Sequence, residues 1–233
     1  MSYGTLKSKL FGTVGGLAVA GMVLAGVATS AAFTASSPQA AKPGAITPPP
    51  LPPGMAPVPA GNELFLGTHA VGTQNYVCKP SGAGVAYVLF TPEATLFGED
   101  GGQVITHYFS PNPSEPNTDP KLVAAGLIRA TWQHRDTSTV WAFVEPGHSY
   151  SLPDFVAQGA VAWLRLTVVG TKEGTAERNT LTKTTYIQRV NTFGGLAPAT
   201  GCSASADVGK QAFMPYTADY IFYEGPEDAG ANH

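Results

Sequence analysis

The sequence predicts an all-β fold, a single-domain β-sandwich or barrel that is mostly antiparallel and has few short helical turns. Between residues 62 and 226, apolar side chains repeat with period two much more often than with the 3.6-residue period of a helix. Gly, Pro, Asn and Asp interrupt this pattern about every ten residues. Short strands separated by such turn residues are typical of sandwiches and barrels.

Residues 1–30 have the features of an export signal. Lys7 and Lys9 precede a small-residue apolar run that ends near Ala28, and the small side chains that follow suit a signal peptidase. We therefore predict a signal peptide and an extracytoplasmic location, whether secreted, periplasmic or on the cell surface. A leader retained as a membrane anchor is the alternative, because the run approaches the roughly 20 residues that span a bilayer.

Residues 31–61 are rich in Ala, Ser and Pro and include the run Thr47–Gly54, in which five of eight residues are proline. Proline fixes φ and lacks the amide donor, so we predict a semi-rigid linker. We expect residues 1 to about 60 to make no core contacts. The β domain is then predicted at 62–226, and residues 227–233 form a polar tail.

Nine segments of the domain match the strand pattern. In the segment 182–191, Ile187 and Arg189 share one face, as in a half-buried strand. The segment 139–144 is apolar on both faces, so we expect it to be covered on both sides. The candidate strands are 63–67, 74–78, 85–90, 104–109, 127–133, 139–144, 161–169, 182–191 and 216–223. Short helical turns are expected at 120–125 and 153–158, after the cap residues Asp119 and Ser151.

Charge and composition exclude some functions. The chain has 13 basic and 16 acidic residues, and removal of the leader with its two lysines changes the net charge from −3 to −5, since 11 − 16 = −5. No basic stripe is present, so we predict no nucleic-acid partner. Charged residues are only 12% of the chain, and neutral polar surfaces suit carbohydrate contact. No complete nucleotide-binding or nucleophile motif is present, so we predict no cofactor.

Cys78 and Cys202 both lie in the exported part of the chain. An even cysteine count in an oxidising compartment predicts a disulfide. Neither residue belongs to a C-x-x-C pair, which argues against a redox or zinc role.

Four phrases of the sequence carry a family resemblance. They are Thr184–Pro198 followed by Gly201-Cys202, Gly72–Cys78, Ala130–Gln133 with Asp136–Trp141, and Pro215–Tyr220. In this order, and over nearly the whole domain, they resemble a family of exported bacterial and fungal proteins filed as domain of unknown function 3455. The resemblance implies a single disulfide-linked domain. It implies no activity and assigns no catalytic residues.

The segment 132–138 combines an aromatic ring, an imidazole, a guanidinium and a carboxylate at a predicted strand end and turn. Trp132 and His134 share a face, and His107 approaches His134 if the two predicted strands pair. His107, Trp132, His134 and Asp136 are therefore our candidate binding residues. The two imidazoles with Asp136 would approach a metal site or a His-Asp general base. No H-x-H or H-E-x-x-H spacing is present, so we predict no metal, and a structural role is the stronger interpretation.

Two charged residues of the last two predicted strands form a second candidate group. For Arg189 and Asp219 we expect a buried ion pair, with a substrate clamp as the alternative.

The function predicted from these observations is a non-enzymatic, secreted or surface-tethered β-domain. We expect it to bind an envelope or environmental ligand, with a glycan as the candidate, through aromatic and neutral polar groups. A membrane contact would come only from an uncleaved leader. The alternatives are a hydrolase or metal-dependent enzyme that uses His107, His134 and Asp136, and a structural envelope protein. An enzyme requires these three side chains to converge in a pocket, whereas a binding module requires an exposed aromatic patch without perturbed acids.

Overall fold

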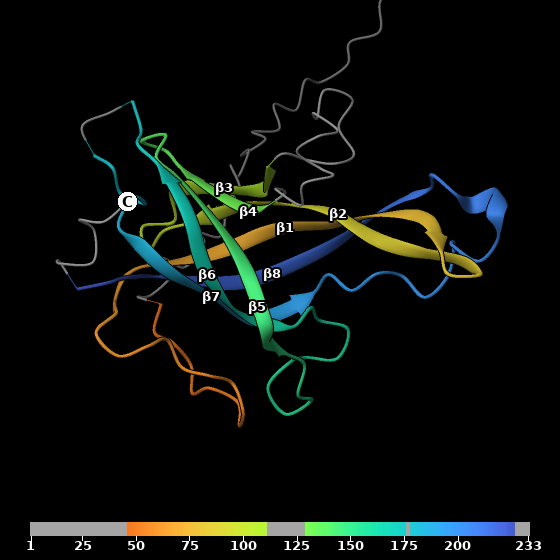
Figure 1. Cartoon of the computed structure of the whole chain (residues 1–233), viewed down its shortest axis with the longest axis horizontal. Helices are drawn as coiled ribbons and strands as arrows, with labels where there is room; N and C mark the ends of the chain where they lie inside the picture. Colours follow the sequence, from red (N-terminus) through yellow and green to blue (C-terminus); the bar gives the residue numbers. More distant parts are fainter. Residues whose placement is uncertain (1–45, 111–128, 176–177, 227–233) are drawn as a thin grey trace, which may run out of the picture. The chain divides into compact units, whose positions relative to one another are not determined.

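The computed structural model describes residues 46–110, 129–175 and 178–226, and the structural statements below refer to these residues. The strands form one closed antiparallel barrel in which each strand pairs with the next and β8 pairs with β1 (Figure 1). The prediction of an all-β fold is confirmed, and the architecture is a barrel. The elements are β1 (Glu63–Ser81), β2 (Gly84–Phe97), β3 (Gln103–Ser110), β4 (Arg129–His134), β5 (Thr139–Tyr150), β6 (Trp163–Lys172), β7 (Thr184–Gly194), the 3-10 helix η1 (Ser205–Asp207) and β8 (Gln211–Glu224).

The predicted strands at 63–67 and 74–78 are parts of one long strand, β1. Gly72 lies between them and marks a close approach of two strands, because a Cβ there would overlap the carbonyl oxygen of Glu93 in β2. Residues 153–158 contain hydrogen-bonded turns, with the amides of Phe155 and Val156 both donating to the carbonyl of Leu152. The predicted helical turn at 120–125 and the first residues of the predicted strand 127–133 lie outside the described residues.

The inside of the barrel contains the main apolar cluster. Trp132 of β4 is fully buried and packs edge-on against Tyr220 and Phe222 of β8. Burial of rings of this size stabilises the fold strongly, by about 3–5 kcal/mol per ring when judged by truncation to alanine. Other buried members of this cluster are Ala70, Ala94, Leu96, Val104, Ile105, Val140, Ala142, Val161, Leu166, Leu181, Ile187, Tyr216 and Ala218.

A second apolar cluster lies on the outer face of the barrel and includes residues from the segment 46–62, which we call the strap. Met55 of the strap is only 5% exposed and belongs to a cluster with Trp163, Val190 and Ile221 of the barrel. Ile46, Leu51 and Val58 pack against the same cluster. The expectation that residues up to about 60 make no core contacts is therefore wrong for residues 46–60. Proline removes backbone donors, but it does not prevent the apolar side chains between the prolines from being buried.

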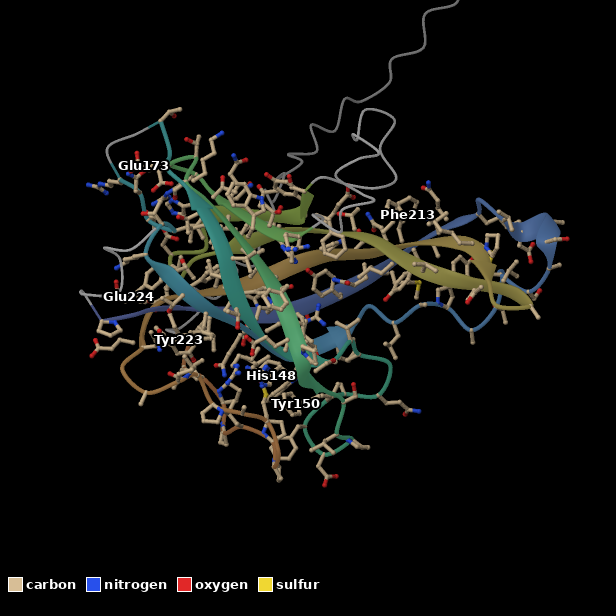
Figure 2. The ribbon with its side chains drawn as sticks, in the orientation of Figure 1. His148, Tyr150, Glu173, Phe213, Tyr223 and Glu224 are labelled. Carbon is tan, nitrogen blue, oxygen red and sulfur yellow. A yellow bond between two sulfur atoms is a disulfide. The ribbon has the colours of Figure 1, made fainter. Side chains whose placement is uncertain are left out.

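Two polar side chains of the barrel also bind the backbone of the strap. The amide of Ala56 donates to the hydroxyl of Tyr150 at 3.0 Å, and Nη1 of Arg165 donates to the carbonyl of Pro57 at 2.6 Å. Nη2 of Arg165 lies 3.4 Å from Oε2 of Glu145 and 3.0 Å from Nε2 of His148. Figure 2 shows His148 and Tyr150 close together on this side of the barrel. The strap is thus held by hydrogen bonds between its backbone and side chains of the barrel, as well as by apolar contacts.

The hairpin of β1 and β2 continues past strands β3 to β7, as the long pair of arrows in Figure 1 shows, and β8 accompanies β1 as far as Val77. We call residues 76–89 the arm. Cys78 in the arm forms a disulfide with Cys202, with the two Cα atoms 5.5 Å apart. The amide of Cys78 also donates to the carbonyl of Lys210, and its carbonyl accepts from the amide of Gly209. The predicted disulfide is therefore present, and it ties the arm to the connection between β7 and β8.

Candidate functional site

The turn between β4 and β5, residues 134–138, is held by its one acidic side chain. We call these residues the charged turn. Oδ1 of Asp136 lies 3.0 Å from Nδ1 of His134 and accepts from the amide of Ser138 at 2.9 Å and from its hydroxyl. Oδ2 of Asp136 accepts from the amide and the hydroxyl of Thr180, at 2.9 and 2.7 Å. Asp136 therefore joins the charged turn to the segment before β7.

These bonds determine the charge state of Asp136. Burial by itself would raise the pKa of this carboxyl, but the hydrogen bonds from Ser138 and Thr180 outweigh it and hold the pKa well below its ordinary value. Oδ1 accepts from Ser138 in the turn, and Oδ2 accepts from Thr180 in the segment before β7. The group is thus an ionised structural acceptor and not a carboxylate free to take a proton from a ligand.

Thr137, the next residue, has a φ of 69°, which is rare for a β-branched side chain. Such backbone conformations cost about 1–3 kcal/mol and persist where the surroundings impose them. Here the hydroxyl of Thr137 accepts from the amide of Thr175 at 2.7 Å, and the amide of Thr137 donates to the carbonyl of His134. The charged turn is therefore strained and fixed in one conformation before any ligand arrives.

A hollow of about 350 Å³ opens beside the charged turn, over the start of β3 and the end of β4. Its volume is in the range of sites that take small ligands. The guanidinium of Arg135 is exposed and forms no hydrogen bond or ion pair with a described residue. No carboxylate of a described residue lines the hollow. The lining residues are Gln103, Val104, Ile105, Thr106, Gln133, His134, Arg135 and Thr137.

The structure places the four candidate binding residues in two locations. His134 and Asp136 lie together in the charged turn, whereas His107 and Trp132 lie inside the barrel. β3 does pair with β4, but His134 lies opposite Ile105, and His107 lies opposite Trp132. No hydrogen bond joins His107 to His134 or Asp136, and no group of three or more metal-binding side chains exists within the described ranges.

His107 is stacked on Trp132 with ring centroids 4.3 Å apart, and its Nδ1 lies 2.8 Å from the carbonyl oxygen of Thr131. The pKa of His107 is lowered to about 3, mainly by burial; the hydrogen bond to Thr131 opposes this shift, and the charge of Arg189 adds to it. The ring is therefore neutral at physiological pH. With Nδ1 protonated, it donates to the Thr131 carbonyl.

The expected ion pair between Arg189 and Asp219 is not formed. Asp219 accepts from Asn191 at 2.7 Å and lies 2.9 Å from Nδ1 of His69, whereas Arg189 donates from Nε and Nη2 to the carbonyl of Ala162. In the register of β7 and β8, Asp219 lies opposite Val190, so it is on the outer face. Arg189 shares the inner face with Ile187, as the alternation in the sequence indicated.

Sequence reasoning did not find the polar groups that share the inside of the barrel with Arg189. The hydroxyls of Tyr216 and Tyr220 lie 3.4 Å apart. Burial raises the pKa of Tyr216 well above its ordinary value, and Tyr220 adds to this shift. The amide of Gln74 faces the Tyr216 hydroxyl, but its Nε2 has no acceptor in hydrogen-bond geometry. Strand alternation could have placed these side chains inside, but nothing in the sequence showed that they meet.

Aromatic side chains are exposed on another part of the barrel surface. Phe193 is 67% exposed and Phe213 is 55% exposed. Phe193 lies opposite Thr217 on β8, and Thr217 lies opposite the exposed Val71 on β1. Phe213 lies on the same face of β8 as Thr217, with Pro215 between them. We call Phe193, Phe213 and Val71 the aromatic face; Phe213, labelled in Figure 2, is at the end of the barrel that carries the arm.

A family model described as "Protein of unknown function (DUF3455)" matches residues 59–224, which is more than half of the 233 residues. The chain belongs to this family. The match confirms the resemblance seen in the sequence. The DUF3455 domain of this chain, residues 59–224, therefore begins near the end of the strap and ends with the last residue of β8. No curated protein and no solved structure matches the chain.

The residues of this DUF3455 protein described here include no helix with the length and apolar character needed to cross a membrane.

Proposed function

We propose that this protein is an exported, non-catalytic binding domain that recognises a carbohydrate of the cell envelope or the environment in the hollow beside the charged turn. The observation that carries the proposal is the hollow itself, which is lined by neutral amides and hydroxyls next to a fixed, strained turn. Its leader-like N-terminus and its disulfide support an extracytoplasmic location.

The chemistry of the hollow suits sugar hydroxyls. Gln103 and Gln133 each supply an amide with two donors and an acceptor, and Thr106 and Thr137 supply hydroxyls that both donate and accept. Arg135 adds a cation, which extends the range of ligands to glycans that carry an acidic group. Preorganisation reduces the entropy cost of binding, and the bonds of Asp136 supply it here.

The aromatic face is the alternative location for the same function. Aromatic rings stack on sugar faces, and Phe193 and Phe213 are the most exposed large apolar side chains of the described residues. An exposed group of this kind is a common mark of a binding surface. Thr217 lies between Phe193 and Val71 in the strand register, and the pair of His69 and Asp219 lies two residues further along the same face.

The enzyme alternative has less support from the geometry. A His-Asp base built from His107 and Asp136 would need the two side chains at one site, but His107 is inside the barrel. His134 and Asp136 do make a pair at 3.0 Å. The other bonds of Asp136 hold the turn, so the pair has a sufficient structural explanation.

The test is binding of the protein to a panel of purified polysaccharides and to a glycan array. In one variant, Gln133→Ala is combined with Thr106→Ala; in the other, Phe193→Ala is combined with Phe213→Ala. We expect the first variant to lose at least tenfold in affinity and the second to keep it. Gln211→Ala and Phe143→Ala are matched controls, since Gln211 is exposed and Phe143 is 38% exposed.

The opposite result, with affinity lost only in the phenylalanine variant, would move the site to the aromatic face. Binding that neither variant reduces, or no binding to any glycan, would contradict the proposal. Urea unfolding of each variant shows whether a loss of affinity is only a loss of fold.

A further inference from the structure

One end of the barrel interior contains a cation with no counter-ion. Arg189 is half-buried, and its described hydrogen bonds are those from Nε and Nη2 to the carbonyl of Ala162, at 3.1 and 2.9 Å. Among the described residues it forms no ion pair with a carboxylate. A guanidinium carries five donors, and one carbonyl cannot satisfy them. The remaining donors of this half-buried guanidinium have no acceptor among the described residues, so they are open to water or to an anion that reaches this end of the barrel.

A second, independent observation is an unpartnered donor at the same end. Nε2 of Gln74 faces the hydroxyl of Tyr216 but has no acceptor in hydrogen-bond geometry among the described residues, although Gln74 is only 2% exposed. Buried polar groups without a partner are rare, and each one points to a missing water or ligand. Gln74 lies on the inner face of β1, because it is four residues from Ala70 of the barrel core and every second residue of a strand shares a face.

The contacts around Gly195 bring these groups together. A Cβ on Gly195 would lie 2.9 Å from Cβ of Tyr216, 3.0 Å from Cγ of Gln74 and 3.2 Å from Cγ1 of Val161. Val161 precedes Ala162, the residue that Arg189 binds. The hydroxyl of Tyr216 lies 3.4 Å from that of Tyr220, and Tyr220 lies opposite Arg189 in the strand register.

Electrostatics agree with this placement. Burial raises the pKa of Tyr76 and of Tyr216, and the positive charge of Arg189 opposes the rise at both hydroxyls. Oη of Tyr76 donates to the carbonyl of Gly195 at 2.7 Å, so this hydroxyl closes the end of the barrel. Burial lowers the pKa of His107, so its ring is neutral and adds no second positive charge beside Arg189.

We propose that this end of the barrel is a binding site for a small anion, a carboxylate above all, held by Arg189, the amide of Gln74 and the hydroxyl of Tyr216. A planar guanidinium and an amide are suited to the two oxygens of a carboxylate. Gly195 packs closely against Tyr216, Gln74 and Val161 at this end, so a small anion is a better candidate than a large ligand. This inference does not depend on the hollow or on carbohydrate binding.

The test is thermal unfolding of the full chain in increasing sodium acetate, sodium phosphate and sodium chloride. A ligand that binds only the folded state raises the midpoint along a saturating curve, by a few degrees once its concentration is far above Kd. We expect this curve with acetate in the wild type and its loss in Arg189→Gln. Saturation by phosphate or chloride at a lower concentration than acetate would overturn the choice of a carboxylate.

A second variant protects the test against misfolding of Arg189→Gln. Gln74→Glu adds a carboxylate beside Arg189, so it should remove the acetate response while keeping a midpoint at least equal to that of the anion-free wild type. Arg178→Gln is the matched control, because it replaces the same pair of side chains at an exposed position. It should keep the full response.

The comparison between variants also removes general salt effects, because these act almost equally on the wild type and on variants that differ from it by one residue. A wild type without a saturating response, or an acetate response that survives in both Arg189→Gln and Gln74→Glu, would overturn the inference. Glycan binding is measured separately, so the two proposals can fail independently.

Discussion

The neutral state of His107 makes a sharp prediction for the stability of the barrel in acid. Its pKa is lowered to about 3 in the folded protein, mainly by burial, against an ordinary value of 6.5. The folded state therefore binds fewer protons than the unfolded state between these two pH values. The contribution of this group to stability is complete above pH 6.5 and is lost as the pH falls toward 3.

The magnitude follows from the size of the shift. Each pH unit within the window costs about 1.4 kcal/mol, so the wild type should lose about 3 kcal/mol between pH 6.5 and 4.5 from this residue. His107→Phe keeps a ring of similar size against Trp132, which lies 4.3 Å away, but leaves the Thr131 carbonyl without its donor. We expect a cost of about 1–3 kcal/mol at pH 7.5. The two stability curves should therefore converge or cross near pH 5.

Urea unfolding at pH 7.5, 6.5, 5.5 and 4.5 measures the free energy of unfolding of the wild type and of His107→Phe. The difference between the two proteins removes the contributions of the other titrating groups, which they share. Curves that run parallel over this range would refute the reasoning, because they would mean that His107 titrates alike in the folded and unfolded chains. A His107→Phe variant that is already unfolded at pH 7.5 would show instead that the hydrogen bond to Thr131 is worth more than we assign.

Two further predictions concern the strap and the arm. Met55→Ala should lower the free energy of unfolding by about 2–3 kcal/mol, because Met55 is only 5% exposed, whereas Val169→Ala at a 49% exposed site should change it by less than about 0.5 kcal/mol in the same urea experiment. Equal effects would mean that the strap does not pack in solution. Replacing Cys78 and Cys202 together by serine should cost roughly 2–5 kcal/mol by urea unfolding, since the disulfide closes a loop with a sequence separation of 124. A cost below about 1 kcal/mol would show that strand pairing alone fixes the arm.

Much of the architecture could be predicted because period-two alternation and turn residues are local signals. They located most of the strands, but they divided β1 into two segments, 63–67 and 74–78, although Gly72 lies inside β1 where that strand approaches β2. The strap shows a different limit. Proline content indicates a missing backbone donor, but it does not report whether Met55 or Leu51 finds an apolar surface elsewhere in the fold.

The candidate site was predicted only in part, and the reason is register. Alternation correctly placed Trp132 and His134 on one face, but the pairing of Ile105 with His134 depends on the whole length of β3 and β4. A shift by two residues would have put His107 opposite His134. The groups around Arg189 come from β1, β7 and β8, and such an assembly leaves no spacing in the sequence.

The pairing of β1 with β8 determines when the barrel can form. Glu63 lies opposite Glu224, so the first strand finds its partner only when the last strand is available. During synthesis, and during any passage of the chain through a membrane, the hairpins of neighbouring strands can form early, but the barrel stays open until its final residues arrive. A high proportion of distant contacts also slows folding. The open intermediate exposes strand edges that the finished barrel hides, and the protein depends on a fast last step to avoid self-association.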